Sequence, residues 1–205
     1  MLGGASALSS NTAAVTLQMR RACMNTFLIL VGCRGGDSTV ECGMKTLFLV
    51  RHAKSSWDDP KLADEDRPLN ARGKRDAPKI GKRLAKRDVK LDLILSSPAN
   101  RAITTAQVLA DKLDFKLENI VVDDRLYPGA VSALLRVVRN LGNQLNRVML
   151  VGHHPALSQL AHRLSSDITH MPTCAVAEFT FKAKSWRDVR KATLATVALD
   201  LPKKP

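Results

Sequence analysis

From Thr46 onward, short apolar runs rich in β-branched residues alternate with longer amphipathic patterns, and this alternation limits the possible fold more than any other feature of the sequence. It is typical of β-α-β units, which build a mostly parallel sheet with helices on both faces. We therefore expect a three-layer α/β/α sandwich with a mostly parallel central sheet. The last two expected strands would close the domain as a hairpin or as a pair of edge strands. The expected strands are residues 46–50, 91–95, 119–122, 147–151, 178–181 and 193–199.

The helical patterns carry boundary signals of their own. Asn70 is a suitable N-cap for the first helix, which runs to about Lys86, and Pro78 inside it predicts a break or a kink. The exposed face of this helix is basic, and we interpret it as a solvated face rather than as a docking surface. Its cations are Arg72, Lys74, Arg75, Lys79, Lys82 and Arg83. The other expected helices are residues 101–112, 131–141 and 156–164.

Residues 1–43 differ in composition from the rest of the chain. They are rich in Ser, Thr, Ala and Gly and show no sustained periodic pattern, so we expect a disordered leader or non-core extension followed by one domain at residues 44–205. Three interpretations are open: an organellar transit peptide, a secretory or lipoprotein leader, and sequence upstream of a true start at Met44. We favour the third, because Met44 stands directly before the first expected strand. No run of about 20 apolar residues is present, so no transmembrane helix is expected.

The chain has 32 basic and 19 acidic residues, a net charge of +13, and residues 44–205 hold +12 of it. An excess of this size indicates an anionic partner without identifying it. Only eight aromatic residues are spread along the chain and no motif for stacking on RNA bases is present, so no nucleic-acid partner is expected. Four cysteines without a C-x-x-C pair indicate a reducing compartment, no disulfide framework and no zinc site.

Unusual polar residues follow three of the expected strands. The first strand is followed by RHA at 51–53, the second by SSPANR at 96–101, and the fourth by GHHP at 152–155. Ligands of open α/β sheets bind beyond the carboxyl ends of the strands. We therefore expect all three loops to face one pocket.

Two imidazoles and two guanidiniums at one pocket suit the transfer of a phosphoryl dianion. Arginine holds two phosphate oxygens at once through its planar fork and stays charged at any working pH, while a neutral imidazole nitrogen can attack phosphorus. Each motif alone has an ordinary alternative, such as a histidine bonded to loop backbone or a Gly and a Pro that only shape a turn. Their combination, each at a strand end, is much harder to obtain by accident.

Four stretches carry a resemblance to a known family: LFLVRHAKSSW, DRPLNARGKRDA, LILSSPANRAITTA and VMLVGHHP. With them the chain resembles the histidine phosphatase superfamily, and within it the small SixA-like branch of phosphohistidine phosphatases. The resemblance implies a phosphoglycerate mutase-like fold in which His52 is the nucleophile and His153 is the second pocket histidine. It also implies that Arg51 and Arg101 bind phosphate. His154 stands where the family often has another residue, and we leave it out of the catalytic set.

The chain departs from the family pattern at two places. Ala53 stands where the family has Gly, which is tolerable if the φ angle is negative. The glutamate that serves as acid in mutase-type members has no counterpart in RLYPG at 125–129, so the acid for the leaving group is unassigned. Asp58 is a candidate for this role, with neighbouring Asp59, and the alternative is that both are surface acids.

Two further residues of the same region are candidates for supporting roles. Ser55 can donate a hydrogen bond to phosphate, and a turn-capping hydroxyl is the equally good alternative. Arg67 is expected to fix the loop ahead of the first helix.

We predict a phosphatase with no cofactor and no metal, since the sequence has no glycine-rich phosphate loop and no carboxylate cluster for Mg²⁺. The predicted substrate is a phosphohistidine on a protein, because its P–N bond breaks without a strong acid once the leaving imidazole is protonated. The alternatives are a small-molecule phosphomonoesterase or mutase of the same superfamily, and a non-catalytic module that binds a phosphorylated ligand or nucleic acid. We expect a cytoplasmic monomer without membrane association, or a plastid or mitochondrial protein if residues 1–43 are a transit peptide.

Overall fold

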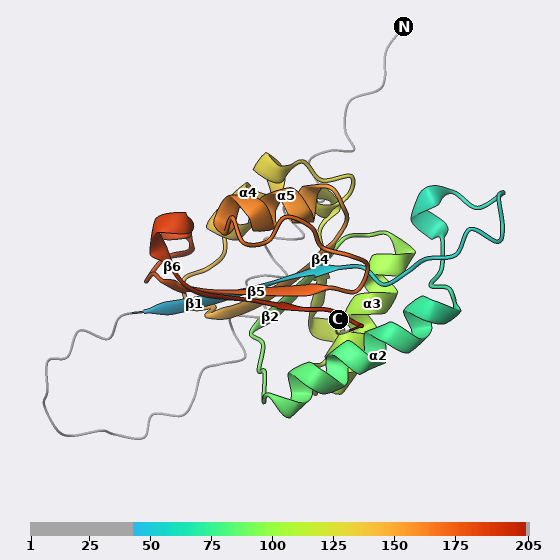
Figure 1. Ribbon diagram of the computed structural model, residues 1–205, viewed down its shortest axis with the longest axis horizontal. Helices are drawn as coiled ribbons and strands as arrows, with labels where there is room; N and C mark the ends of the chain where they lie inside the picture. The colour runs from blue at the N-terminus through green and yellow to red at the C-terminus, as the bar shows by residue number, and fades with distance from the viewer. Residues whose placement is uncertain (1–42, 204–205) are drawn as a thin grey trace, which may run out of the picture. The chain divides into compact units, whose positions relative to one another are not determined.

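The computed structural model describes residues 43–203, so the predictions for residues 1–42 lie outside the described residues. Six strands form one sheet in the order β3-β2-β4-β1-β5-β6 (Figure 1). The strands from β3 to β1 run parallel, and β5 pairs antiparallel with both of its neighbours, which confirms the mostly parallel sheet with an antiparallel closing pair. The strands are β1 (Met44–Arg51), β2 (Leu93–Ser96), β3 (Ile120–Val122), β4 (Arg147–Gly152), β5 (Val176–Lys182) and β6 (Leu194–Asp200).

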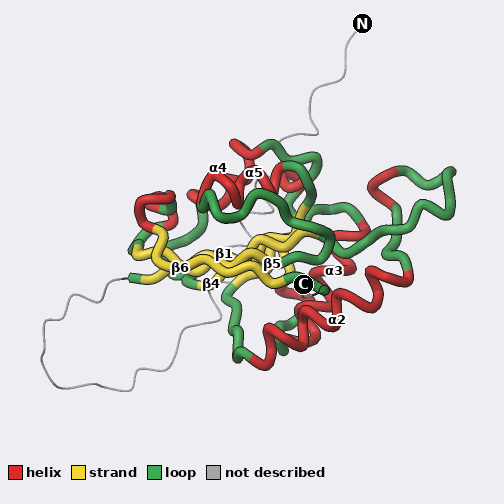
Figure 2. Tube along the Cα trace, viewed as in Figure 1, coloured by secondary structure: helices red, strands yellow, loops and turns green. Residues whose placement is uncertain are grey.

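Helices cover both faces of the sheet. α2 and α3 lie on one face and α4 and α5 on the other (Figures 1 and 2), so the predicted three layers are confirmed. The α-helices of the described part are α2 (Ala71–Lys86), α3 (Asn100–Lys112), α4 (Val131–Arg139) and α5 (Ala156–Leu164). Its short 3-10 helices are η1 (Asp64–Asp66), η2 (Leu117–Asn119), η3 (Asp124–Leu126), η4 (Trp186–Asp188) and η5 (Lys191–Thr193).

The N-terminus of α2 is anchored beside the loop that follows β1. Asn70 caps the helix as predicted, since its side chain accepts a hydrogen bond from the N–H of Gly73 at 2.9 Å. A Cβ atom at Gly73 would lie 2.2 Å from the carbonyl oxygen of Lys54, so only glycine allows this close approach. Of the predicted break or kink at Pro78, the break does not occur: α2 continues to Lys86, since burial of its apolar face outweighs the loss of one backbone hydrogen bond.

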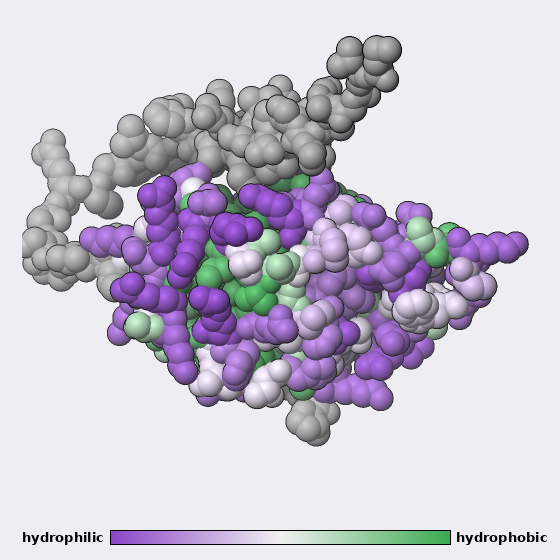
Figure 3. Space-filling view, turned by 90° about the horizontal axis from the view of Figure 1, so that it is seen from above, coloured by the Kyte–Doolittle hydropathy of each residue, from purple (hydrophilic) through white to green (hydrophobic). Residues whose placement is uncertain are grey.

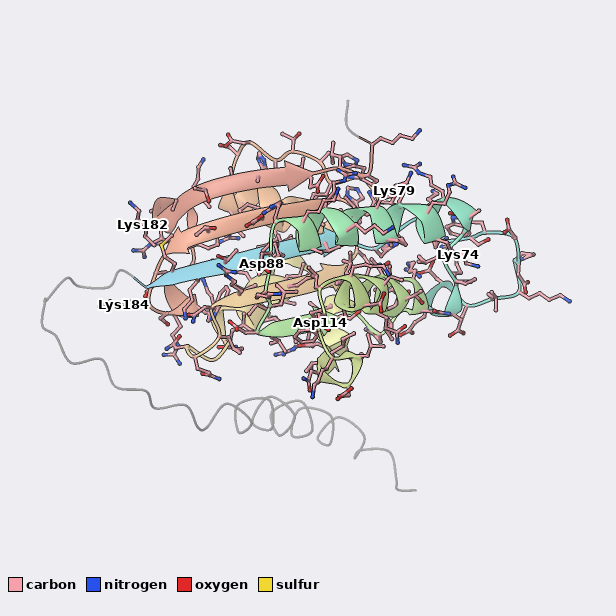
Figure 4. The ribbon with its side chains drawn as sticks, turned by 90° about the horizontal axis from the view of Figure 1, so that it is seen from below. Lys74, Lys79, Asp88, Asp114, Lys182 and Lys184 are labelled. Carbon is pink, nitrogen blue, oxygen red and sulfur yellow. The ribbon has the colours of Figure 1, made fainter. Side chains whose placement is uncertain are left out.

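The outer surfaces of the two helical layers are mainly hydrophilic. Seen from the side of α2, Lys74 and Lys79 lie on the exposed surface of that helix (Figure 4). Asp88 and Asp114 each follow the C-cap residue of α2 and α3, and their positive φ angles of 50° and 54° are those of the left-handed residue that often terminates a helix. The visible part of the opposite face is polar with a smaller hydrophobic area (Figure 3). No helix within residues 43–203 is long and apolar enough to cross a membrane.

Candidate active site

The register of three neighbouring strands brings the polar loops together. Arg51 pairs with Gly152 where β1 and β4 end. The next residues, His52 and His153, therefore lie side by side, with ring centroids 4.9 Å apart. β2 pairs with the other side of β4, which brings Ser97 to the same edge of the sheet. The expectation that the three loops face one pocket is met.

A cavity of about 380 Å³ opens at this edge. Five of the six predicted site residues line it: Arg51, His52, Ser55, Arg101 and His153. Asp58 is the exception. Side chains that were not assigned to the site from the sequence complete the wall, among them Lys54, Trp57, Asp64, Arg67, Tyr127 and His154.

The ring of His52 is buried and has a fixed orientation. Its Nδ1 lies 2.7 Å from the carbonyl oxygen of Ala53. A carbonyl oxygen only accepts, so Nδ1 carries the proton and Nε2 keeps its lone pair. Burial, helped by the positive charges of nearby arginines, lowers the pKa of His52 to about 4. His52 is therefore a neutral imidazole at pH 7, as a nucleophile must be.

Alanine is accommodated at position 53. Ala53 is fully buried and is not among the residues with positive φ. Alanine therefore replaces glycine here without backbone strain. Its N–H donates to the hydroxyl of Thr105 on α3 at 3.0 Å, which ties the loop after β1 to that helix.

The second histidine has a buried serine as its partner. Nε2 of His153 lies 2.8 Å from the hydroxyl oxygen of Ser97, which is fully buried. Burial, together with the neighbouring His52 and Arg101, lowers the pKa of His153 to about 3. Ser97 belongs to the SSPANR stretch that indicated the second loop, but only the pairing of β2 with β4 shows that it contacts His153.

The two predicted phosphate-binding arginines are held differently. Arg51 donates from Nη1 to the carbonyl oxygen of Met171 at 2.8 Å, and its buried Nε has no hydrogen-bond partner within the described residues. Burial lowers the pKa of Arg51. Arg101, at the start of α3, donates from Nη2 to the carboxylate of Asp64 at 2.7 Å. Its Nη1 donates to the main-chain carbonyl oxygen of Asp64. Both guanidiniums therefore present fixed N–H groups to the cavity.

Asp64 is a site residue that sequence reasoning missed. Its carboxylate accepts hydrogen bonds from Arg67 and Arg101, each at 2.7 Å, and from the hydroxyl of Tyr127 at 2.8 Å. Burial raises the pKa of Asp64, but these donated hydrogen bonds outweigh it and hold the pKa at about 2. The ring of Tyr127 also contacts the ring of His153, with centroids 5.1 Å apart. Asp64 lies in a polar segment without periodicity. Its place in the site can therefore be seen only from the residues that it contacts in the folded chain.

The loop after β1 leaves one predicted residue outside the cavity. Asp58, a candidate for the general acid, is exposed and accepts a hydrogen bond from the hydroxyl of Ser56, so the structure does not bring it to the other predicted site residues. Arg67 fixes this loop as expected, since it donates to the carbonyl oxygen of Ser56 at 2.8 Å and to the hydroxyl oxygen of Ser55 at 2.7 Å. The Ser55 hydroxyl thus accepts from Arg67 and keeps its own proton to donate.

Metal ligands do not gather in the part of the chain that the structure describes. No group of three or more His, Cys, Asp or Glu side chains there could hold a metal ion. The prediction of catalysis without a metal stays a prediction.

Comparison with known proteins agrees with this geometry. The model of the histidine phosphatase superfamily (branch 1) matches residues 47–127. An uncharacterised protein of Mycobacterium tuberculosis is 32% identical over 166 residues, which cover 75% of this chain and 100% of that protein. An uncharacterised chloroplastic protein of Arabidopsis thaliana is 30% identical over 152 residues, or 70% of each chain. The crystal structure of an Agrobacterium tumefaciens protein assigned as phosphohistidine phosphatase SixA matches 66% of this chain and 91% of its own, with 31% identity and a TM-score of 0.60.

Proposed function

The chain belongs to the histidine phosphatase superfamily, in its SixA-like branch, and is a phosphatase; from this membership we propose that it hydrolyses a phosphohistidine on a protein through an intermediate on His52. Because the chain belongs to a family of enzymes, we no longer propose the alternative of a non-catalytic binding module.

The reaction has two steps. In the first, the lone pair on Nε2 of His52 attacks phosphorus, the P–N bond of the substrate breaks, and the leaving imidazole takes a proton from water. In the second, water attacks the same phosphorus, the bond from phosphorus to Nε2 of His52 breaks, and inorganic phosphate leaves. His52 regains its lone pair, and the proton released by the attacking water neutralises the hydroxide left by the first step. Arg51 and Arg101 neutralise the phosphoryl oxygens in both steps, and Ser55 donates a further hydrogen bond. His153, neutral and next to the attacking ring, contacts the phosphoryl group from the other side.

One observation carries this proposal: the unprotonated Nε2 of a buried His52 lies beside His153, in a cavity that Arg51 and Arg101 also line. A histidine that only supported the loop would need no second imidazole at 4.9 Å and no arginines in the wall of the same cavity.

The preference for phosphohistidine rests on the acid chemistry of the cavity. Asp64 is the carboxylate that lines it, and a pKa of about 2 keeps this group ionised at neutral pH, so it has no proton to give to an alkoxide. A leaving imidazole needs no such acid, since water protonates it. The SixA assignment of the A. tumefaciens relative supports the same substrate.

A direct comparison of substrates tests the proposal. Purified protein is assayed with a phosphohistidine peptide, glucose 6-phosphate and 3-phosphoglycerate at equal concentration. We expect kcat/KM for the peptide to exceed the others by at least about a hundredfold, because an alkyl phosphate lacks a good leaving group. Faster hydrolysis or isomerisation of a sugar or glycerate phosphate would instead establish the small-molecule alternative.

Localisation and assembly belong to the proposal as well. The chloroplastic relative supports the plastid alternative to a cytoplasmic protein. A fluorescent protein fused after residue 43 distinguishes the two locations. Fluorescence in plastids would show that residues 1–43 act as a transit peptide. Diffuse fluorescence in the cytoplasm would support the prediction of a cytoplasmic protein. A monomer remains our expectation, and light scattering on the purified chain checks it.

A further inference from the structure

Trp57 is an exposed aromatic residue at the rim of the cavity. Its exposed fraction is 72%, and it is one of the residues that line the opening. Large aromatic side chains usually bury most of their surface, as the other tryptophan of the chain, Trp186, does completely. The reaction described above gives Trp57 no role.

The indole of Trp57 is held by a rigid cation. The guanidinium carbon of Arg67 lies 3.2 Å from the centroid of the ring. Arg67 is itself only 6% exposed, and its hydrogen bonds to the loop and to Asp64 fix its position. One face of the indole therefore rests on a fixed plane, and the exposed surface of the ring faces the solvent beside the phosphate-binding groups. An aromatic surface that is fixed in advance loses little entropy when a ligand binds to it.

We infer that Trp57 determines specificity by stacking on the aromatic ring that carries the phosphoryl group, which is an imidazole if the proposed function is right. Planar rings stack favourably on indole, whereas a sugar or glycerate offers no flat surface. The inference rests on the proposed function and narrows it: the leaving group is recognised as a ring, next to the arginines that recognise the phosphate.

Two substrates with the same bond and different leaving groups isolate this role. Phosphohistidine and phosphoramidate both contain a P–N bond, but phosphoramidate releases ammonia and has no ring. In Trp57→Leu we expect kcat/KM for free phosphohistidine and for a phosphohistidine peptide to fall about tenfold, and kcat/KM for phosphoramidate to change less than about twofold. Trp57→Phe keeps a ring and should restore most of the loss.

Leu62→Ala is the matched control. Leu62 is an exposed apolar residue of the same loop, at 40% exposure, and does not line the cavity. We expect this variant to hydrolyse all three substrates at the wild-type rate. Equal losses on phosphohistidine and phosphoramidate in Trp57→Leu would overturn the inference, because Trp57 would then act only by supporting Arg67. A loss confined to the peptide would also overturn it, since Trp57 would contact the partner protein and not the ring.

Fluorescence gives a second readout that does not need turnover. Trp186 donates from its ring to the carbonyl oxygen of Leu145, near Lys45 at the start of β1, whereas the cavity lies beyond the end of that strand. In His52→Ala, phosphohistidine should quench tryptophan emission, and in His52→Ala/Trp57→Leu it should not. Equal quenching in both would overturn the inference. If the wild type fails to hydrolyse phosphohistidine at all, the proposed function fails first, which is a different result from any of these.

Discussion

The cavity and the outer surface of α2 are both strongly basic, but they hold their cations in opposite ways. In the cavity, Arg67 and Arg101 are 6% and 5% exposed, and hydrogen bonds fix both guanidiniums. On α2, Lys74 and Lys79 extend into water (Figure 4). Exposed charges interact weakly and are screened by salt, whereas fixed buried ones act at full strength. The site is therefore defined by cations that are fixed around one cavity, and not by the number of charges.

The largest effect expected from this contrast is that of Arg101→Ala. Removing a fixed charge from the phosphate-binding wall should lower kcat/KM about a thousandfold. Arg101→Lys should recover only part of the loss, because a lysine cannot present two parallel N–H groups. Steady-state kinetics measure this, with thermal unfolding to show that the fold is kept. A loss in kcat/KM of less than tenfold would contradict the role of Arg101 in binding the phosphoryl group.

The electrostatics of the cavity also predict an unusual titration. The pKa of His52 is about 4 instead of 6.5, so at pH 5 the neutral ring is about 30 times more abundant than it is in an ordinary histidine. We expect NMR of the ring protons to show a midpoint near pH 4. A midpoint near 6.5 would mean that burial and the arginines do not act on this ring as the structure indicates.

The same shift links the fold to pH. An unfolded chain protonates position 52 near pH 6.5 and the folded chain does so near pH 4. The contribution of the neutral ring to stability is therefore complete above pH 6.5 and is lost as the pH falls toward 4. Between pH 6.5 and pH 4, the melting temperature of His52→Asn should therefore fall less than that of the wild type.

Ser97→Ala probes a smaller contribution, that of the buried hydroxyl bonded to His153. Loss of the hydrogen bond to His153 should lower kcat/KM about tenfold, without a change in affinity for inorganic phosphate. Ser165→Ala is the control, because Ser165 is also buried but bonds to Asp167 outside the cavity. Equal kinetics in both variants would remove Ser97 from the site.

The smallest effect is expected on α2. Lys74→Gln and Lys79→Gln should each change kcat/KM on a phosphohistidine peptide less than about twofold, at low and at high salt. Larger, salt-sensitive losses on a whole phosphorylated protein, but not on the peptide, would show that this helix is a docking surface and would correct our interpretation of it as a solvated face.

The sequence was informative where local pattern decides the structure. His52 and His153 could be predicted to meet, because parallel strands end at one edge of a sheet whatever their order. The cap at Asn70 followed from its position ahead of an amphipathic pattern. Five of the six cations expected on the exposed face of α2 are exposed, as helical periodicity predicts, whereas Arg83 is partly buried and pairs with Asp200.

The parts that were missed depend on contacts between segments that carry no periodic signal. Asp58 was a candidate for the missing acid because of its place in the family pattern, but the loop leaves it exposed and brings Asp64 to the cavity instead. The stacking of Arg67 on Trp57 arises from the way the loop folds back, which no spacing predicts. Pro78 was expected to break or kink α2, and the helix is not broken there because its apolar face is buried.

His52 is the residue proposed to accept the phosphoryl group. Rapid quenching of the protein after exposure to a ³²P-labelled phosphohistidine peptide tests this role. We expect label on the wild-type protein that acid removes and alkali does not, located at residue 52 by peptide mapping, and no label on His52→Ala. Undiminished label on His52→Ala, or wild-type label on another residue, would contradict it.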